Sequence, residues 1–423
     1  MRTIYSGLLY LAAPLALLRL WWKGRRQPEY RARIAERFGR VTPAPDGVAV
    51  WVHAVSVGET LAAAPLIERL IERHGQGRLW LTTTTPTGSA RASAAFGARV
   101  RHSYAPYDLP HAVARFLDRV RPRLIVVMET ELWPNLFRAA SARGIPLVVA
   151  NARLSPRSLR GYARLRTFFA GVLADCAWVA AQSEADAQRF RSLGAARVSA
   201  IGNLKFDLQV PPAQVAAGHQ WRTQLGSGRP VWIAASTHEG EEQAALAAHR
   251  KIVEQRPDAL LILVPRHPQR FEAVAQLVRN AGFDLVRRSA PSFPRCASGT
   301  PSAVLLGDSM GEMYAYLAAA DVAFVGGSLV PVGGHNVLEP AALSLPVLFG
   351  PHMHNFQAAR ELLLASGAAV EVADGTALAH ETLALFGDPA RRARMGAAGR
   401  AAVDANRGAL NRLLTLLDTI SAA

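Results

Sequence analysis

The chain has little cysteine, little lysine and only one long apolar run. Two cysteines, Cys176 and Cys296, lie far apart among 423 residues and form no C-x-x-C pair. This excludes a disulfide framework and a structural zinc site, and we expect both cysteines to be small core residues. Beyond the N-terminus, nearly every apolar stretch is interrupted by a charge within ten residues, which excludes a transporter with many membrane spans.

Several motifs of common enzymes are also missing. The chain has no G-x-x-x-x-G-K-S/T, no G-x-G-x-x-G and no H-E-x-x-H, which argues against P-loop nucleotide hydrolysis and simple dinucleotide chemistry. His352 and His354 form an H-x-H pair. Because no pair of acidic residues lies near it in the sequence, we predict no metal site there.

Basic residues are abundant, although only three of the 48 are lysines, Lys23, Lys205 and Lys251. This dominance of arginine mostly reflects a composition bias. The net charge of +16 indicates an anionic partner, which can be nucleic acid, anionic lipid or a phosphorylated substrate. The positions of the charges have to decide among these partners.

The long apolar run lies at the N-terminus. Thr3–Leu18 carries no charge, and the twenty residues counted through Trp22 are about the length of a spanning helix. The segment 19–40 then carries eight basic residues and two acidic ones. A secretory signal would place its positive charge before the apolar run. We therefore expect residues 1–22 to anchor the chain in a membrane, with the rest in the cytosol beside an anionic leaflet.

Two placements of this anchor fit the sequence. Its length is just sufficient for a helix that crosses the bilayer. Pro14 and the marginal length fit equally well a helix that lies along the membrane surface.

Downstream of the anchor, short β-branched runs alternate with amphipathic stretches. Continuous apolar runs of four to six residues predict parallel strands that are covered on both faces. The expected strands are 48–53, 79–83, 124–128, 147–150 and 178–181 in the first half, and 231–235, 260–264, 303–306, 322–325 and 347–349 in the second.

The pattern breaks between the two halves at Pro211-Pro212 and at Gly226-Ser227-Gly228. We therefore predict two doubly wound α/β domains, residues 23–208 and 209–423, which face each other across a cleft. The arginine-rich C-terminal helices, from about Asp388, are the part that can cross back onto the first domain.

Polar residues follow the strands of the first domain, where ligands bind in doubly wound folds. Glu59 lies near the start of the helix after the first strand; the ordinary role of such a residue is to complement the helix dipole. Glu129 and Glu131 follow the strand 124–128, and we expect one to be solvated or capping and the other to point toward Glu59. Lys205 supplies a compact ammonium group where arginine is the rule.

The second domain offers features suited to a phosphate and a ribose. Arg266 and His267 follow a predicted strand, in a loop that suits a phosphate. The segment 308–312 is another loop after a strand. Gly326-Gly327-Ser328 and Gly333-Gly334 let backbone amides approach a phosphate closely, and Glu339 in a first helical turn can accept hydrogen bonds from ribose hydroxyls.

With these residues in view, the chain resembles the 3-deoxy-D-manno-octulosonic acid (Kdo) transferases of Gram-negative bacteria. The resemblance extends from the N-terminal anchor to about Gly367. It rests on Ser56-Val57-Gly58-Glu59, Met128 to Asn135, Asn151-Ala152-Arg153-Leu154-Ser155, Leu204-Lys205-Phe206-Asp207, Pro265-Arg266-His267 and Asn336 to Pro340.

The resemblance implies a GT-B fold, with two Rossmann-like domains and the donor on the C-terminal one. It implies that Glu59 is the general base and that Glu131 and Lys205 support the transition state. It also implies a set of residues that hold CMP: Arg266, His267, Met310, Gly311, Glu312, Asn336, Val337, Leu338 and Glu339.

The activity implied by the resemblance is transfer of Kdo from CMP-Kdo to a tetra-acylated lipid A precursor at the cytoplasmic face of the inner membrane. We expect no metal and no other cofactor, because helix dipoles and basic side chains can neutralise the leaving phosphate. The partners are then CMP-Kdo, the lipid A precursor and anionic lipid. The number of Kdo residues added is left open by these motifs.

Two other functions are compatible with parts of the sequence. The first is a different membrane-surface GT-B enzyme that uses a UDP-sugar. The second is a membrane-tethered nucleic-acid-binding protein, which the positive charge would allow. Because we find no basic surface interleaved with aromatic residues and no recognition motif, we expect no nucleic-acid partner.

Overall fold

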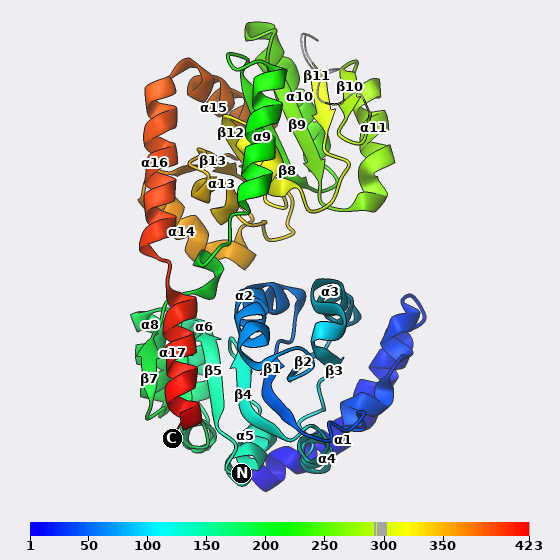
Figure 1. Cartoon of the computed structure of the whole chain (residues 1–423), viewed down its shortest axis with the longest axis vertical. Helices are drawn as coiled ribbons and strands as arrows, with labels where there is room; N and C mark the ends of the chain where they lie inside the picture. Colours follow the sequence, from blue (N-terminus) through cyan, green and yellow to red (C-terminus); the bar gives the residue numbers. More distant parts are fainter. Residues whose placement is uncertain (292, 294–302, 423) are drawn as a thin grey trace. The chain divides into compact units, whose positions relative to one another are not determined.

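The chain forms two compact units in a computed structural model that describes residues 1–291, 293 and 303–422 (Figure 1). Unit 1 comprises Met1–Asp207 together with Asn406–Ala423, and unit 2 comprises Leu208–Ala405. Cys296 lies outside the described residues.

Unit 1 is built on a parallel seven-stranded sheet in the order β3-β2-β1-β4-β5-β6-β7. The central strands are the apolar runs expected from the sequence, because helices cover both faces of the sheet. The strands are β1 (Val48–His53), β2 (Leu79–Thr83), β3 (Arg101–Tyr104), β4 (Pro122–Met128), β5 (Leu147–Ala152), β6 (Trp178–Ala181) and β7 (Val198–Ala200).

Successive side chains of each strand point to opposite faces of this sheet. Val50 and Val52 of β1 join one core with α2, α3 and α17, whereas Trp51 between them joins a second core with α4, α5, α7 and α8. The helices of unit 1 after the N-terminal one are α2 (Val57–His74), α3 (Pro86–Phe96), α4 (Pro110–Val120), α5 (Pro134–Ser141), α6 (Pro156–Ala163), α7 (Arg166–Ala174), α8 (Glu184–Leu193) and α17 (Ala409–Ala422), with 3-10 helices η1 (Pro28–Arg31), η2 (Ile34–Phe38), η3 (Gly97–Arg99) and η4 (Leu204–Phe206).

Unit 2 repeats the same architecture, with the order β10-β11-β9-β8-β12-β13-β14, again all parallel. Its strands are β8 (Val231–Thr237), β9 (Leu260–Pro265), β10 (Asp284–Arg287), β11 (Ala303–Leu306), β12 (Val322–Val325), β13 (Val347–Phe349) and β14 (Ala369–Glu371). Its helices are α9 (Pro212–Leu225), α10 (Glu241–Gln255), α11 (Phe271–Asn280), α12 (Met313–Ala318), α13 (Leu338–Ala342), α14 (Gln357–Ala365), α15 (Gly375–Gly387) and α16 (Pro389–Ala405), with η5 (Pro268–Arg270) and η7 (His354–Phe356).

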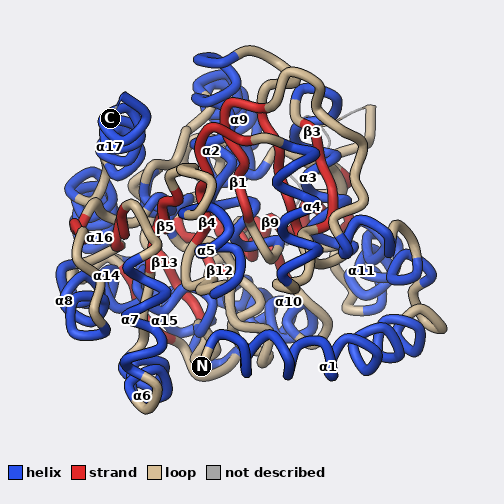
Figure 2. The backbone as a smooth tube through the Cα atoms, turned by 90° about the horizontal axis from the view of Figure 1, so that it is seen from below, coloured by secondary structure: helices blue, strands red, loops and turns tan. Residues whose placement is uncertain are grey.

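The two sheets confirm the predicted fold class, two Rossmann-like doubly wound units of the GT-B type after an N-terminal helix. In Figure 2 the red strands run between blue helices. The order of the strands reverses between β1 and β4 in unit 1 and between β8 and β12 in unit 2. These switch points are where open α/β sheets bind ligands.

The C-terminal end of the chain is divided differently from the expected domain 209–423. Helix α16 stays in unit 2, whereas α17 belongs to unit 1, where Leu413, Leu414 and Leu417 join the core. The carboxylate of Asp207 fixes the start of this helix, because it accepts hydrogen bonds from the backbone N–H groups of Gly408 and Leu410, each at 2.6 Å. The last helix thus packs against one face of the first sheet.

The apolar N-terminus forms a single helix, α1 (Arg2–Lys23). Among the described residues it is the one helix with the length and composition of a membrane span, with 22 residues and a mean hydropathy of 1.4 over its apolar window of 18 residues. None of its residues is buried. The helix therefore lies outside the cores that hold unit 1 together.

Candidate active site

Glu59 follows β1 and closes the N-terminal cap of α2. Ser56 is the N-cap residue, and its hydroxyl accepts a hydrogen bond from the Glu59 N–H at 3.2 Å. The carboxylate of Glu59 accepts in return from the Val55 N–H at 2.8 Å and from the Ser56 hydroxyl at 3.0 Å. This reciprocal arrangement resembles a capping box, with the Val55 N–H in place of the N–H of the N-cap residue. The ordinary helix-capping role of Glu59 is therefore present in the structure.

The same carboxyl group also has the acidity that proton transfer requires. Glu59 is only 8% exposed. Burial, together with the negative charges of Glu129 and Glu131, raises its pKa to about 7, although the hydrogen bonds from Val55 and Ser56 oppose this shift. A carboxyl group that titrates near neutral pH suits a general base.

The two acidic residues after β4 lie close enough to act on Glu59 and have different partners. Glu131 accepts a hydrogen bond from the indole N–H of Trp133 at 2.7 Å. Glu129 faces the Lys205 ammonium group, with 3.8 Å between the charged atoms. The structure thus brings together the three predicted residues Glu59, Glu131 and Lys205, and it adds Glu129, which the sequence prediction had not selected.

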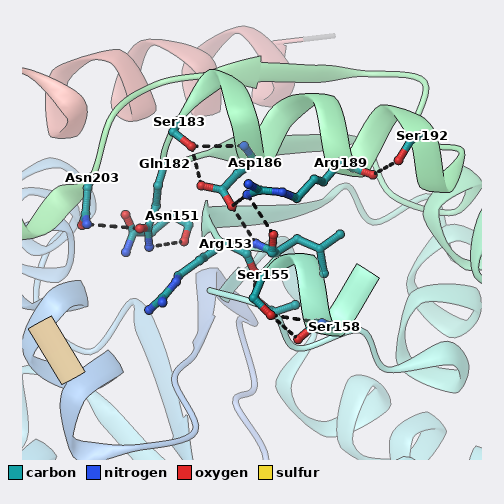
Figure 3. Close-up of polar contacts among 12 residues, drawn as sticks. Asn151, Arg153, Ser155, Ser158, Gln182, Ser183, Asp186, Arg189, Ser192 and Asn203 are labelled. Carbon is teal, nitrogen blue, oxygen red and sulfur yellow. Dashed lines mark hydrogen bonds and ion pairs between the residues drawn. The ribbon is translucent and has the colours of Figure 1, made fainter. Parts of the chain in front are cut away.

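A hydrogen-bonded chain across β5, β6 and η4 positions the Lys205 segment (Figure 3). The Asn203 amide donates to Gln182 at 3.1 Å, and the Gln182 amide donates to the Asn151 carbonyl at 3.0 Å. The Asn151 side chain accepts from the Leu204 N–H at 3.0 Å. Asn151 has a φ of 53°, a left-handed conformation that Asn tolerates better than most residues. This constraint explains part of the motif around Asn151.

The rest of that motif builds the adjoining loop. The Asp186 carboxylate accepts from the Leu154 N–H at 2.9 Å, and the Ser155 hydroxyl caps α6. The Arg153 side chain extends away from Ser183 and Asp186 in Figure 3. Within the described residues, no hydrogen bond or ion pair of its guanidinium group is present. Most of this motif therefore positions the backbone, and Arg153 leaves a cation available beside it.

In unit 2, one buried carboxylate organises the loop after β12. Glu241 is 0% exposed and accepts backbone hydrogen bonds from His238 at 2.9 Å, Gly327 at 2.6 Å, Ser328 at 2.9 Å and Leu329 at 2.9 Å. These bonds tie the end of β8 to the end of β12 at the switch point. The sequence prediction missed this residue, although Ser236–Glu241 follows a predicted strand and the same positional rule applied to it.

Three histidines from different loops meet at this edge. His238 and His335 are hydrogen bonded at 2.8 Å through their Nε2 atoms, with stacked rings, and His267 packs edge-on against His238 with ring centroids 5.3 Å apart. Burial and the nearby Arg266 guanidinium lower the pKa of His335 to about 3. At neutral pH the His335 ring is therefore neutral, and in its hydrogen bond with His238 one Nε2 atom donates and the other accepts. Burial also lowers the pKa values of His238 and His267, and Arg266 supplies a guanidinium cation at this edge.

Glu339 lies in the first turn of α13, beside Asn336. The Asn336 side chain caps this helix by accepting from the Leu338 N–H at 3.1 Å, and its amide donates to the Glu339 carboxylate at 3.2 Å. Desolvation raises the pKa of Glu339 to about 7, against the opposing effects of Asn336 and Arg266. Val337 and Leu338 are 0% exposed as whole residues, so neither presents its side chain to a ligand here.

The remaining predicted CMP-binding residues lie on the loop after β11. Met310 is 58% exposed, the Gly311 carbonyl accepts from the Gln214 amide at 2.8 Å, and Glu312 pairs with Arg288 at 2.8 Å. No hydrogen bond or ion pair within the described residues joins this loop to Arg266, His267, Asn336 or Glu339. Asn336 and Glu339 are hydrogen bonded and the charge of Arg266 acts on Glu339, whereas residues 310–312 follow β11, the strand next to β9.

The same loop also matches the G-x-S-x-G pattern of serine hydrolases, in Gly307-Asp308-Ser309-Met310-Gly311. The Ser309 hydroxyl donates to Glu312 and lies 2.6 Å from the Tyr316 hydroxyl. In the described part of the chain it has no histidine partner. A catalytic triad is therefore not assembled at this serine.

The described residues contain no group of three or more His, Cys, Asp or Glu side chains that could hold a metal ion. Cys176 is half-buried. Its thiol donates to the Trp178 carbonyl at 3.1 Å, and burial raises its pKa to about 12. A thiol with this pKa is not a nucleophile at neutral pH.

Comparison with known proteins identifies the family. Residues 32–208 match the family model described as 3-deoxy-D-manno-octulosonic-acid transferase (kdotransferase). A 3-deoxy-D-manno-octulosonic acid transferase of Haemophilus influenzae is 41% identical over 98% of this chain and 98% of its own length. The chain belongs to the Kdo transferase family. The corresponding enzyme of Bordetella pertussis is 42% identical over 99% of both chains.

A solved structure supports the fold of this Kdo transferase. The UDP-GlcNAc 2-epimerase of Neisseria meningitidis covers 88% of this chain and 100% of its own, with a TM-score of 0.56 and 13% identity. At that identity the likeness concerns the fold alone. The chain is thus a glycosyltransferase of the Kdo transferase family with two Rossmann-like units.

Proposed function

We propose that this Kdo transferase moves Kdo from CMP-Kdo to a tetra-acylated lipid A precursor, lipid IVA, with Glu59 as the general base. The observation that carries the proposal is the Glu59 carboxyl group itself. It is buried at the switch point of unit 1, among Glu129 and Glu131, and has a pKa of about 7. A group with these properties can accept a proton at the pH of the cytosol.

The proposed step is a displacement at the anomeric carbon of Kdo. A sugar hydroxyl of the acceptor forms the new C–O bond while the bond from that carbon to the CMP phosphate breaks. Glu59 takes the hydroxyl proton, and the bonding electrons leave with the phosphate of CMP. Lys205, paired with Glu129, and Glu131 would support the transition state from the same strand ends.

The donor would bind at the switch point of unit 2. Arg266 supplies positive charge for the phosphate, and His267 and the amides after β12 supply hydrogen bonds. Glu339 would accept hydrogen bonds from the ribose hydroxyls, with Asn336 holding its carboxylate. Met310, Gly311, Glu312 and the backbone of Val337 and Leu338 would complete the CMP site. We propose that this chemistry needs no metal, since the cation and the amides can neutralise the leaving group.

The acceptor would arrive at the membrane surface. The apolar helix α1 and the basic segment 19–40 favour association with the cytoplasmic leaflet of the inner membrane. A lipid A precursor carries acyl chains and phosphates, which suit these two features. Nucleic acid is not among the proposed partners.

Product mass tests the proposal directly. Purified protein incubated with CMP-Kdo and lipid IVA should yield lipid IVA heavier by one or more Kdo residues, and the mass counts them. Thermal protection by CMP and CTP but not by UDP should identify the nucleotide. Protection by UDP alone, with no change in acceptor mass, would contradict the assignment of the donor.

A further inference from the structure

Helix α1 presents a continuous apolar stripe to solvent. Its members recur at alternating steps of four and three residues, which return to one side of a helix. Each is between 61% and 76% exposed. The stripe consists of Ile4, Leu8, Leu11, Leu15, Leu18 and Trp22.

The opposite side of α1 is partly covered along its whole length. Its half-buried residues are Arg2, Tyr5, Ser6, Leu9, Ala13, Ala16, Leu17, Leu20 and Lys23. Helical spacing places all of them on the side away from the stripe. A helix that crossed the bilayer freely would not be bonded to its own protein along this face, as the first half of α1 is.

Specific hydrogen bonds hold the first turns of this covered face. The Tyr5 hydroxyl donates to Asp108 at 3.0 Å, and the Ser6 hydroxyl donates to Asn135 at 3.0 Å. Arg2 pairs with Asp175 at 2.8 Å. All these partners belong to unit 1.

Further hydrogen bonds within unit 1 hold the Asp108 carboxylate in place. Asp108 is only 8% exposed, and its carboxylate also accepts from the backbone N–H groups of Asn135 at 3.0 Å and Leu136 at 2.8 Å, in the first turn of α5. Tyr5 therefore binds a carboxylate that the fold has already fixed. This makes the contact with α1 specific.

The other end of α1 contacts the segment that follows it, which is rich in cations. Arg31 donates to the Trp21 carbonyl at 3.0 Å, and the Arg25 guanidinium lies over the Trp21 ring at 4.4 Å. Beside the middle of the helix, Tyr10 contacts His111 at 2.6 Å. His111 lines a hollow of about 270 Å³ with Arg40, Arg115, Ala35 and Phe38. Cations thus border the apolar stripe, as anionic headgroups require.

We infer that α1 lies in the plane of an anionic phospholipid leaflet and does not cross it. The stripe enters the acyl region, the covered face stays on unit 1, and the bordering arginines meet the headgroups. The first turns of the helix are bonded to unit 1, and the chain after Lys23 continues into the same unit, so crossing would break the contacts of Arg2, Tyr5 and Ser6. This inference deepens the proposed function, since it sets the side from which a lipid acceptor reaches unit 1.

The inference can be tested by finding on which side of the membrane the N-terminus lies. Thr3→Cys and Arg26→Cys, each in the full chain with Cys176 and Cys296 replaced by alanine, place one thiol at each exposed end of α1. A membrane-impermeant maleimide should label both thiols in inside-out vesicles and neither in sealed right-side-out vesicles. Labelling of Thr3→Cys only in right-side-out vesicles would show a spanning helix and overturn the inference.

A second variant tests the stripe itself. Leu11→Glu, at the most exposed stripe position, should weaken binding to vesicles that contain anionic lipid about tenfold or more. Thr3→Glu adds the same charge outside the stripe and is the matched control, with a clearly smaller loss. Equal losses for both variants would show that charge alone holds the protein, and would overturn insertion of the stripe.

Activity on a dispersed acceptor separates this inference from the proposed function. Transfer of Kdo to lipid IVA in detergent micelles depends on the active site and does not depend on a leaflet. If this transfer is absent, the proposed function fails whatever the labelling shows. If it is present while Thr3→Cys is labelled from the opposite side, the in-plane inference alone fails.

Discussion

Burial raises the pKa of two glutamates, one in each unit, to the same value, although their charged surroundings differ. Glu59 and Glu339 both lie in the first turn of a helix at a switch point, and both have a pKa of about 7. Glu59 is surrounded by further negative charge from Glu129 and Glu131, whereas Glu339 lies near the cation Arg266 and the amide of Asn336. The first environment favours uptake of a proton, and the second favours a fixed hydrogen-bond acceptor. Similar pKa values therefore correspond to different proposed roles.

The largest expected effect is on the chemical step. Glu59→Gln preserves the shape and an acceptor oxygen for the Val55 N–H but removes the base. We expect kcat to fall by about 10²- to 10⁴-fold, with CMP binding retained. Steady-state kinetics with CMP-Kdo and lipid IVA measure this.

Glu131→Gln is the control for that experiment, because it removes a neighbouring carboxylate and leaves Glu59 in place. A Glu59→Gln enzyme that keeps more than about a tenth of the wild-type kcat would reduce Glu59 to its capping role. The proposed difference between the two glutamates would then be lost.

The next effect concerns the donor. Glu339→Ala removes a charged acceptor from the proposed ribose site, where each hydrogen bond is worth about 1.5–3 kcal/mol, or roughly 10- to 150-fold in affinity. We expect a higher KM for CMP-Kdo and weaker CMP binding by calorimetry, with the KM for the acceptor unchanged. An unchanged CMP affinity would leave Glu339 as a residue of the helix terminus only.

The pH dependence of folding stability offers a third comparison. Burial raises the pKa of Glu59 from an ordinary 4.5 to about 7, so the folded state holds its proton more tightly than the unfolded state. The free energy of unfolding should therefore decrease as pH rises from about 4.5 to about 7, by up to about 3 kcal/mol at 1.4 kcal/mol per pKa unit. Glu59→Gln should lack this loss, which urea unfolding at pH 5 and pH 8 can measure. Parallel stability profiles for the two proteins would contradict the raised pKa.

The smallest effect is on the pH profile of the reaction. A base must be ionised, so kcat should rise with pH through about 7. Glu129→Gln removes a negative charge near Glu59 and should move this rise to lower pH by less than about one unit. Glu131→Gln should move it less, because Glu129 has the stronger effect. No shift in either variant would mean that these carboxylates do not act on the group that limits kcat.

The central strands and the edge strands show how far the sequence pattern extends. The ten strands expected from apolar runs are all present, with boundaries within two residues. The four strands that the pattern missed, β3, β7, β10 and β14, are the edges of the two sheets. An edge strand has a neighbour on one side only and is less covered, as in Val198–Ala200, where no residue is buried. Such a strand needs no continuous apolar run.

The site shows the same division between local and distant information. Glu59 and Glu339 could be selected from their positions after a strand and at a helix start. Glu241 and Glu129 also follow predicted strands, but position alone does not reveal their partners, the backbone N–H groups of Gly327 and Ser328 and the ammonium group of Lys205, which are all distant in the sequence.

The sequence by itself determined the class of fold and the family, and it offered Glu59 and Glu339 as candidate site residues, because these depend on local periodicity and on short motifs. Only the tertiary structure decided that α17 packs in the core of unit 1 and that the first turns of α1 are bonded to the same unit. It also decided that the Glu59 carboxylate bonds to its own helix start and has a pKa near 7. These features depend on which surfaces meet. Twenty apolar residues have the same hydropathy whether lipid surrounds them or a protein covers one side, so composition cannot distinguish the two placements.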